Sequence, residues 1–322
     1  MAVKEISSYL NGYSKIPIIC GPTASGKSSI ALRLCELSGG ELLSCDSMQI
    51  YKHLDVGTAK ATVEERDLIK HHLTDIVEPG TYFSVNDYVS KCCESIEDCL
   101  SRGKLPVICG GTGQYISALK DGLRFVDEPI PEELIKELEA EYDDKGAQAL
   151  YSRLEALDPE ASSNMHMNNK RRVVRALAVC LATGKTFTLW NQSSKTTGPL
   201  YPFVLFMPDY EDCRDVLYDR INKRVDVMIE QGIIEEARYL YSLDIDRKST
   251  CFQAIGYKEF ENYIKDPSKE NLDEAIYKIK LNSRHYAKRQ LTWFRYIDEI
   301  VKLDVSSDVD TLIKDIIIPN LQ

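Results

Sequence analysis

The residues with the clearest chemistry stand near the N-terminus, in the segment G-P-T-A-S-G-K-S. This segment matches the phosphate-loop pattern G-x-x-x-x-G-K-[ST]. The glycines let the backbone curl so that N–H groups point into one cavity, where the positive end of the following helix also lies. The pattern predicts a site for phosphate or diphosphate and does not say which reaction takes place. The residues of this predicted site are Gly21, Pro22, Thr23, Ala24, Ser25, Gly26, Lys27 and Ser28.

Lys27 and Ser28 give this loop its predicted chemistry. The ammonium of Lys27 would neutralise terminal phosphates, and the Ser28 hydroxyl would hold Mg²⁺, which we expect as the cofactor. A glycine turn without a ligand is the alternative. However, an apolar run, IPIIC, precedes the loop and a helical pattern, IALRLCEL, follows it. This context of strand, loop and helix is the one in which phosphate loops bind their ligands.

Two other polar positions follow predicted strands. Asp46 ends the run ELLSCD, and Thr112 lies in C-G-G-T-G after KLPVI. Ligands bind beyond the carboxyl ends of parallel strands in open α/β sheets, so both side chains would face the phosphate loop. Asp46 could then accept a proton from a substrate, and Thr112 could hold a leaving phosphate. The alternatives are a helix cap at Asp46 or Ser47 and an ordinary turn at GGTG.

The elements that position these residues alternate along the chain. Short apolar strands are expected at 16–20, 41–46 and 104–112, separated by amphipathic helices, which predicts a parallel sheet in an α/β fold. Residues 125–197 break this rhythm because they are charged and helical, up to a polar loop at 188–200. We therefore expect a P-loop parallel-sheet core with an all-helical insertion domain. The predicted domains are 1–124, the first part of the core; 125–197, the insertion; and 198–322, the second part with a β-rich run at 201–207 and C-terminal helices.

The formal net charge of −10 is unevenly distributed along the chain. Residues 127–160 hold twelve acidic and three basic side chains, a net of −9. In contrast, residues 166–175 carry four Lys or Arg and residues 278–295 carry six, with no acid in either segment and three aromatic residues in the second. Basic segments with interleaved aromatics are typical of surfaces that bind RNA. A partly buried amphipathic helix is the alternative for the aromatic residues.

Composition also indicates where the protein works. The ten cysteines form no C-x-x-C pair, no run of 18 apolar residues occurs, and the N-terminus lacks the apolar core of a signal peptide. We expect a cytoplasmic monomer without membrane association.

The order of the motifs resembles the bacterial tRNA dimethylallyltransferase family, also called tRNA isopentenyltransferases. The resemblance covers roughly residues 15–300. It rests on GPTASGKS (21–28), SCDSMQIYKHLDVGTAK (44–60), HHLTDIVEP (71–79), VICGGTGQY (107–115), NKRRVVRALAVCLATGK (169–185), RVDVMIEQGIIEEA (224–237), QAIGYKEF (253–260) and HYAKRQLTWFR (285–295).

The resemblance implies a reaction and the roles of several residues. Members of this family transfer a dimethylallyl group from dimethylallyl diphosphate to N6 of an adenine next to the anticodon of tRNA, and their phosphate loop grips the donor's diphosphate. Catalytic roles are implied for Asp46, Lys27, Thr112 and Arg224, with Asp46 accepting the proton of the amine. Contacts with the tRNA anticodon stem-loop are implied for Asp46, Ser47, Met48, Gln49, Thr112, Arg171, Arg172, Val173, Val174, Arg175, Gln253, Ala254, Ile255, Gly256, Tyr257 and Lys258.

Three other functions stay open at this stage. An isopentenyltransferase acting on free AMP, ADP or ATP would share the fold, but a nucleotide acceptor needs no extended basic surface. A small-molecule kinase would consume ATP; a motor ATPase is disfavoured because a strand ending in Asp-Asp or Asp-Glu is not evident. A nucleotide-dependent RNA-binding module would retain tRNA without modifying it.

Overall fold

The computed structural model describes residues 4–10, 12–122, 130–194 and 198–322. The chain divides into two compact units, one of Asp121–Gly198 and one of Ala2–Lys120 together with Pro199–Gln322. The smaller unit overlaps the predicted insertion at 125–197. Residues 125–129 and 195–197 of that prediction lie outside the described residues.

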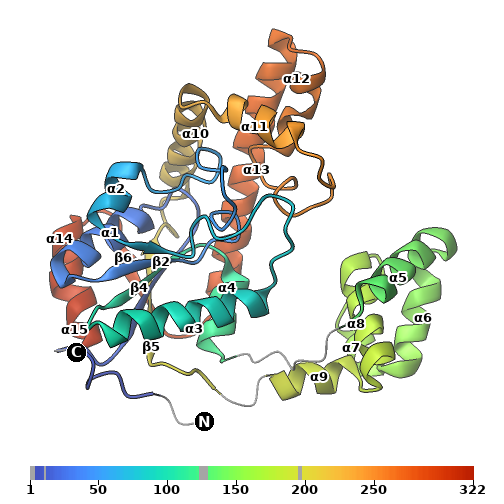
Figure 1. Cartoon of the computed structure of the whole chain (residues 1–322), viewed down its shortest axis with the longest axis horizontal. Coiled ribbons are helices and arrows are strands. Elements are labelled where there is room, and N and C mark those ends of the chain that lie inside the picture. The colour runs from blue at the N-terminus through green and yellow to red at the C-terminus, as the bar shows by residue number, and fades with distance from the viewer. Residues whose placement is uncertain (1–3, 11, 123–129, 195–197) are drawn as a thin grey trace. The chain divides into compact units, whose positions relative to one another are not determined.

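The larger unit is built on a six-stranded sheet in the order β3-β2-β4-β1-β5-β6, and every neighbouring pair is parallel. Figure 1 shows this sheet between α1 and α3. The predicted parallel α/β core is therefore confirmed. The strands are β1 (Ile16–Cys20), β2 (Glu41–Ser44), β3 (His71–His72), β4 (Pro106–Gly110), β5 (Phe203–Asp209) and β6 (Ile300–Asp304).

The two edge strands were not predicted from the sequence. β3 has two residues, and β6 is the half-exposed run IVKLD, which alternates only weakly between apolar and polar side chains. Each is a strand because it hydrogen-bonds to a buried neighbour, β3 to β2 and β6 to β5. Such pairing depends on tertiary structure more than on local sequence.

Helices cover both faces of the sheet. α1 packs against β1, β2 and β4, and α3 packs against β2, β4 and α4. The crossovers β1–α1–β2 and β3–α3–β4 run in opposite directions along the sheet, so their right-handedness puts α1 and α3 on opposite faces. The helices of this unit are α1 (Lys27–Ser38), α2 (Val63–Leu68), α3 (Val85–Ser101), α4 (Gly113–Lys120), α10 (Arg214–Glu230), α11 (Ile233–Ser242), the 3₁₀ helix η1 (Lys258–Phe260), α12 (Glu261–Lys265), α13 (Lys269–Arg295), α14 (Val309–Thr311), the π-helix η2 (Leu312–Ile317) and α15 (Ile318–Leu321).

The smaller unit is helical around its own apolar core, to which Leu138, Leu150 and Leu177 belong. Its helices are α5 (Glu132–Lys145), α6 (Ala147–Leu157), α7 (Pro159–Ser163), α8 (Lys170–Thr183) and α9 (Phe187–Ser194). No single described helix is long and apolar enough to cross a membrane, whereas Lys170–Thr183 and Phe187–Ser193 pass that test only as a pair bent by 84°.

The prediction of a polar loop at 188–200 was wrong for residues 188–194, which are helical. The buried carboxylate of Asp158 stabilises the first turn of this helix, because it accepts hydrogen bonds from the Thr188 amide at 2.7 Å and from the Thr188 hydroxyl at 2.9 Å. The side chain of Trp190, near the middle of this helix, is also buried. Asp158 lies 30 residues before Thr188 in the chain, so the polar sequence of 188–194 alone could not indicate a helix.

Candidate active site

The phosphate loop joins β1 to α1 and contains three residues with positive φ: Gly21 at 143°, Ala24 at 61° and Gly26 at 88°. Glycine adopts such angles at little cost, as the spacing predicted. Ala24 has no such freedom, and a left-handed conformation costs an L-residue roughly 1–2 kcal/mol. Contacts from elsewhere must therefore hold the loop.

Side chains from three distant positions provide those contacts. Arg220 of α10 donates from Nε to the Ala24 carbonyl at 2.8 Å. The hydroxyl of Tyr210, just after β5, donates to the Ser25 carbonyl at 3.1 Å. Gln290 of α13 accepts the Thr23 N–H at 2.9 Å. None of these three supports was predicted from the sequence.

Two cationic side chains converge on the loop. Lys27 donates from Nζ to the Pro22 carbonyl at 3.1 Å, and Arg224 donates from Nη1 to the Thr23 hydroxyl at 3.3 Å. Burial lowers the pKa of Lys27, the charge of Arg224 adds to that effect, and Asp46 opposes it. Burial also lowers the pKa of Arg224, and the negative charge of Asp46 opposes this shift as well. Two partly desolvated cations beside loop N–H groups favour an anion at this position.

Asp46 lies two residues beyond the end of β2, within electrostatic reach of both cations. Its Oδ1 accepts the Met48 N–H at 2.8 Å, which is an Asx turn. The next described helix begins only at Val63, so Asp46 does not cap a helix. Among the described residues nothing donates to Asp46 Oδ2, so this oxygen is available to a substrate proton.

Thr112 ties the loop after β4 to the segment after β2. Its Oγ1 accepts the Ser47 N–H at 3.0 Å, and its own N–H donates to the Cys45 carbonyl at 3.2 Å. A Cβ on Gly110 would lie 2.0 Å from that same carbonyl, so only glycine allows this approach. Thr112 thus positions the Asp46 segment, and its contact with a diphosphate stays a prediction.

The side-chain amide of Gln49, which is predicted to contact RNA, already makes hydrogen bonds within the protein. Its Nε2 donates to the carbonyls of Thr58 and Ala59, both at 3.2 Å, and its Oε1 accepts from the Ser44 hydroxyl at 2.8 Å. Met48 is partly buried against a second apolar core. The segment 46–49 is therefore shaped by internal contacts, and Ser47 and Asp46 remain its best-placed polar groups for a substrate.

One face of α13 closes the site. Burial raises the pKa of Tyr286, the carboxylate of Asp46 raises it further, and a hydrogen bond with Thr112 opposes both effects. Two turns further along, the Trp293 indole donates to Ser117 Oγ at 3.0 Å. A Cβ on Gly113 would lie 2.5 Å from the Trp293 ring, which explains that glycine. The sequence indicated that this run is basic and aromatic, but it did not indicate that α13 contacts the phosphate loop and the loop after β4.

An open cavity of about 660 Å³ adjoins this face of α13. Trp293 is 46% exposed and Tyr296 is 81% exposed, so the cavity offers aromatic surface to a ligand. Its lining residues are Ser117, Lys288, Arg289, Thr292, Trp293, Tyr296 and Ile297, and none of them is acidic. The cavity combines positive charge with aromatic faces, which is the chemistry that unpaired RNA bases and phosphates require.

The other predicted RNA contacts fall on two elements. In α8, Arg171, Arg172 and Arg175 are exposed, whereas Val173 and Val174 are buried in the core of the smaller unit. The side chains of both valines therefore cannot reach RNA, because helix periodicity turns them inward. This correction narrows the predicted contact on α8 to the three arginines.

The segment 253–258 divides in the same way. Gln253 and Lys258 are exposed, but Ala254, Gly256 and Tyr257 are buried. The Tyr257 hydroxyl donates to Glu236 at 2.5 Å, so this side chain is structural and the prediction of its contact with RNA was wrong for the side chain. Ile255 is partly buried against the second apolar core.

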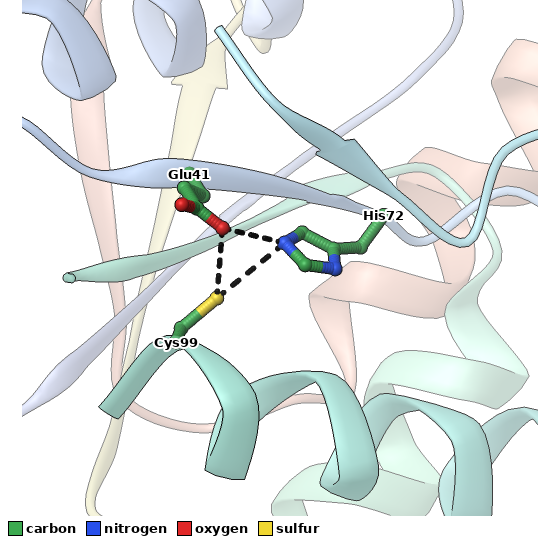
Figure 2. A group of neighbouring side chains, drawn as sticks. All are labelled: Glu41, His72 and Cys99. Atoms are coloured by element: carbon green, nitrogen blue, oxygen red, sulfur yellow. Dashed lines mark hydrogen bonds and ion pairs between the residues drawn. The ribbon is translucent and has the colours of Figure 1, made fainter. Parts of the chain in front are cut away.

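A separate polar group lies at the opposite end of β2. Figure 2 shows Glu41 of β2, His72 of β3 and Cys99 of α3 with their polar atoms facing one another. Glu41 Oε2 lies 2.7 Å from His72 Nε2 and 3.6 Å from Cys99 Sγ, and the latter two atoms are also 3.6 Å apart. Cysteine, histidine and glutamate are ligands that zinc accepts, so the group must be tested as a metal site.

Its charge balance indicates a structural ion pair instead. Arg102 donates to both carboxylate oxygens of Glu41, and Lys70 Nζ lies 3.8 Å from Oε2. A divalent cation would have to enter beside two positive charges that already neutralise the single carboxylate. The group joins β2, β3 and α3 at the sheet edge and is not adjacent to the phosphate loop.

We expect Glu41 to stabilise the fold above pH 4.5 and to lose this effect as the pH falls towards 2. The hydrogen bonds from Arg102, aided by His72, lower its pKa from 4.5 to about 2 against the cost of burial. A depressed carboxyl pKa stabilises the native state only while the group is ionised, and this shift corresponds to about 3 kcal/mol. Urea unfolding of Glu41→Gln against pH measures it. The exposed Glu94→Gln on α3 is the control, and equal stability losses in both variants would contradict this assignment.

The chain is similar to known prenyl-transferring enzymes over most of its length. The sequence model of the family described as IPP transferase matches residues 49–296, and that described as isopentenyl transferase matches residues 14–81. The tRNA dimethylallyltransferase of Acetivibrio thermocellus is 42% identical over 283 residues, covering 88% of this chain and 89% of the relative. That of Geobacillus thermodenitrificans is 47% identical over 281 residues, covering 87% of each.

Solved structures agree in fold. A tRNA isopentenylpyrophosphate transferase from Bacillus halodurans is 41% identical, with a TM-score of 0.66 and coverage of 94% of both chains. A eukaryotic dimethylallyltransferase, described as acting on tRNA, is 26% identical with a TM-score of 0.80, covering 95% of this chain and 77% of that one. The chain therefore belongs to the tRNA dimethylallyltransferase family of prenyl-transferring enzymes.

Proposed function

We propose that this protein transfers a dimethylallyl group from dimethylallyl diphosphate to N6 of an adenine next to the anticodon of tRNA. One observation carries the proposal. The phosphate loop, with Lys27 and Arg224, forms an anion site, and the Asp46 carboxylate lies within electrostatic reach of both cations. A leaving diphosphate and an amine that must lose a proton need this pair of opposite charges.

On the donor side, the chain's cations stabilise the leaving group. The allylic C1–O bond breaks as negative charge builds on the diphosphate, and Lys27, Arg224 and the loop N–H groups neutralise that charge. Ser28, exposed in the first turn of α1, offers a hydroxyl oxygen. Oxygen ligands combined with phosphate oxygens suit Mg²⁺, which would add positive charge at the same atoms when bound.

On the acceptor side, Asp46 acts as the base. The N6 nitrogen forms a bond to C1 while the C1–O bond breaks, and the N6 proton passes to the Asp46 carboxylate. Oδ1 is held by the Met48 N–H, which orients the carboxylate for this transfer. The adenine must be unstacked to reach it, and the aromatic and basic cavity beside α13 would receive the RNA around it.

The relatives support tRNA over a free nucleotide as the acceptor. We expect turnover with an anticodon stem-loop RNA and none above background with AMP, measured as diphosphate released at saturating donor. Equal or greater turnover with AMP would replace this proposal with the nucleotide isopentenyltransferase. Consumption of ATP in the presence of an acceptor alcohol would indicate a kinase.

We expect the triple variant Arg171→Gln, Arg172→Gln, Arg175→Gln to bind tRNA more weakly and with less salt dependence. Each contact with a phosphate of single-stranded RNA contributes roughly −0.7 to the slope of log affinity against log salt, so three contacts contribute about 2. Titration of tRNA at several salt concentrations measures the slope. Affinity for dimethylallyl diphosphate should be unchanged, because the phosphate loop holds that ligand.

A matched control removes three other basic side chains of the same unit, each of which is paired with an acid. Lys136, Lys145 and Arg153 are paired with glutamates on α5 in that acidic unit, so Lys136→Gln, Lys145→Gln, Arg153→Gln should change the slope little. An unchanged slope in the α8 variant, or the same change in both variants, would place the RNA surface elsewhere.

A further inference from the structure

Gln290 is a buried polar side chain between the two loops that form the anion site. It is 6% exposed and lies on α13. Its Oε1 accepts the Thr23 N–H of the phosphate loop at 2.9 Å, and its Nε2 donates to the Gly111 carbonyl after β4 at 2.8 Å. A buried amide that uses both ends on different loops fixes the distance between them, because breaking either bond leaves a buried polar group unpaired.

Gly111, in the loop after β4, leaves room for the Gln290 amide because it has no side chain. A Cβ on Gly111 would lie 2.2 Å from Gln290 Nε2 and 3.0 Å from the Gly21 carbonyl. The first contact is shorter than real Cβ contacts and the second is tighter than most of them, so a side chain at this position would displace the amide. The close approach joins β4, the phosphate loop and α13 at one point.

The peptide unit between Pro22 and Thr23 shows what the amide controls. Its N–H donates to Gln290, and its carbonyl accepts from Lys27 Nζ at 3.1 Å. Because a peptide unit is planar, fixing the direction of the N–H fixes the direction of the carbonyl on the other side. The Thr23 side chain on the same residue accepts from Arg224 at 3.3 Å. Lys27 therefore rests on the peptide unit that Gln290 orients, and Arg224 rests on the side chain of the residue whose N–H Gln290 holds.

We propose that Gln290 is a positioning residue, which orients the Pro22–Thr23 peptide and through it places Lys27 and Arg224 for the diphosphate. The inference rests on the proposed function only for the identity of the ligand. It requires an anion site at the loop, and inorganic pyrophosphate can probe that site without any prenyl transfer.

The test compares Gln290→Met, which keeps the side-chain length and removes both hydrogen bonds, with Tyr277→Phe, an exposed change on the same helix. We expect Gln290→Met to weaken pyrophosphate binding about tenfold to a hundredfold, the usual effect of a lost buried hydrogen bond. The KM for dimethylallyl diphosphate should rise in parallel. Affinity for stem-loop RNA alone should stay within about twofold, and Tyr277→Phe should match the wild type.

A double-mutant cycle with Lys27→Met separates positioning from general support of the fold. If Gln290 acts through Lys27, then Gln290→Met should weaken pyrophosphate binding much less in the Lys27→Met background. Equal effects in both backgrounds, or unchanged pyrophosphate binding in a folded Gln290→Met protein, would overturn the proposal. If Gln290→Met does not fold, Gln290→Asn, whose shorter side chain cannot reach both Thr23 and Gly111, is tested in the same cycle with the same expected and contradicting results. A wild type that binds pyrophosphate but modifies no RNA would contradict the proposed function and leave this test intact.

Discussion

We expect replacement of Asp46 by asparagine to lower the rate of prenyl transfer about 10²–10⁴-fold while the protein keeps its fold. Asparagine retains an Oδ1 that accepts the Met48 N–H, so the Asx turn after β2 survives. The amide cannot take the N6 proton, because it has no ionised oxygen. Single-turnover transfer at saturating donor and RNA measures the loss directly.

The control for this variant is the binding of each substrate. Affinities for dimethylallyl diphosphate and for stem-loop RNA should change far less than the rate does. A protein that unfolds, or that loses RNA affinity with an unchanged rate at saturation, would show that Asp46 only shapes its turn.

We expect replacement of Lys27 by alanine to lower turnover about 10²–10³-fold, the usual cost of removing one stabiliser of a developing negative charge. Lys27 rests on the Pro22 carbonyl, and burial lowers its pKa because the ammonium is partly desolvated; a bound anion offsets that cost. The variant should also bind inorganic pyrophosphate more weakly. Steady-state turnover with varied donor measures the first effect, and inhibition of that turnover by added pyrophosphate measures the second.

The exposed Lys91→Ala on α3, which loses only a pair with Glu94, is the matched control. It should leave turnover unchanged. Near-normal turnover of Lys27→Ala at saturating donor would remove Lys27 from the catalytic machinery.

The parts of the fold that the sequence predicted share one property, a strong local signal. The buried strands β1 and β4 are short apolar runs, and α1 lies between glycines that adopt left-handed conformations at its ends. In contrast, β6 and α9 are formed through pairing with β5 and through hydrogen bonds to Asp158. Such contacts bring together residues far apart in the chain, and a local pattern does not encode them.

The same distinction applies to the site. Lys27 and Asp46 follow strands, so their position at one edge of a parallel sheet could be predicted. Gln290 and Arg220 lie within helices among other polar residues, and nothing in their spacing marks them. Their role becomes visible only when hydrogen bonds to the loop carbonyls and N–H groups are known. The side chain of Val173 is buried, which the motif match could not indicate, and it therefore cannot contact RNA as predicted.

The central claim is most directly tested by mass analysis of the RNA product. Wild-type protein is incubated with anticodon stem-loop RNA, dimethylallyl diphosphate and Mg²⁺, and the RNA is then digested and analysed by mass spectrometry. We predict a five-carbon addition on the adenine next to the anticodon, with one diphosphate released for each modified RNA. A folded protein that retains the RNA but adds no mass, or one that releases diphosphate without modifying the adenine, would contradict the account.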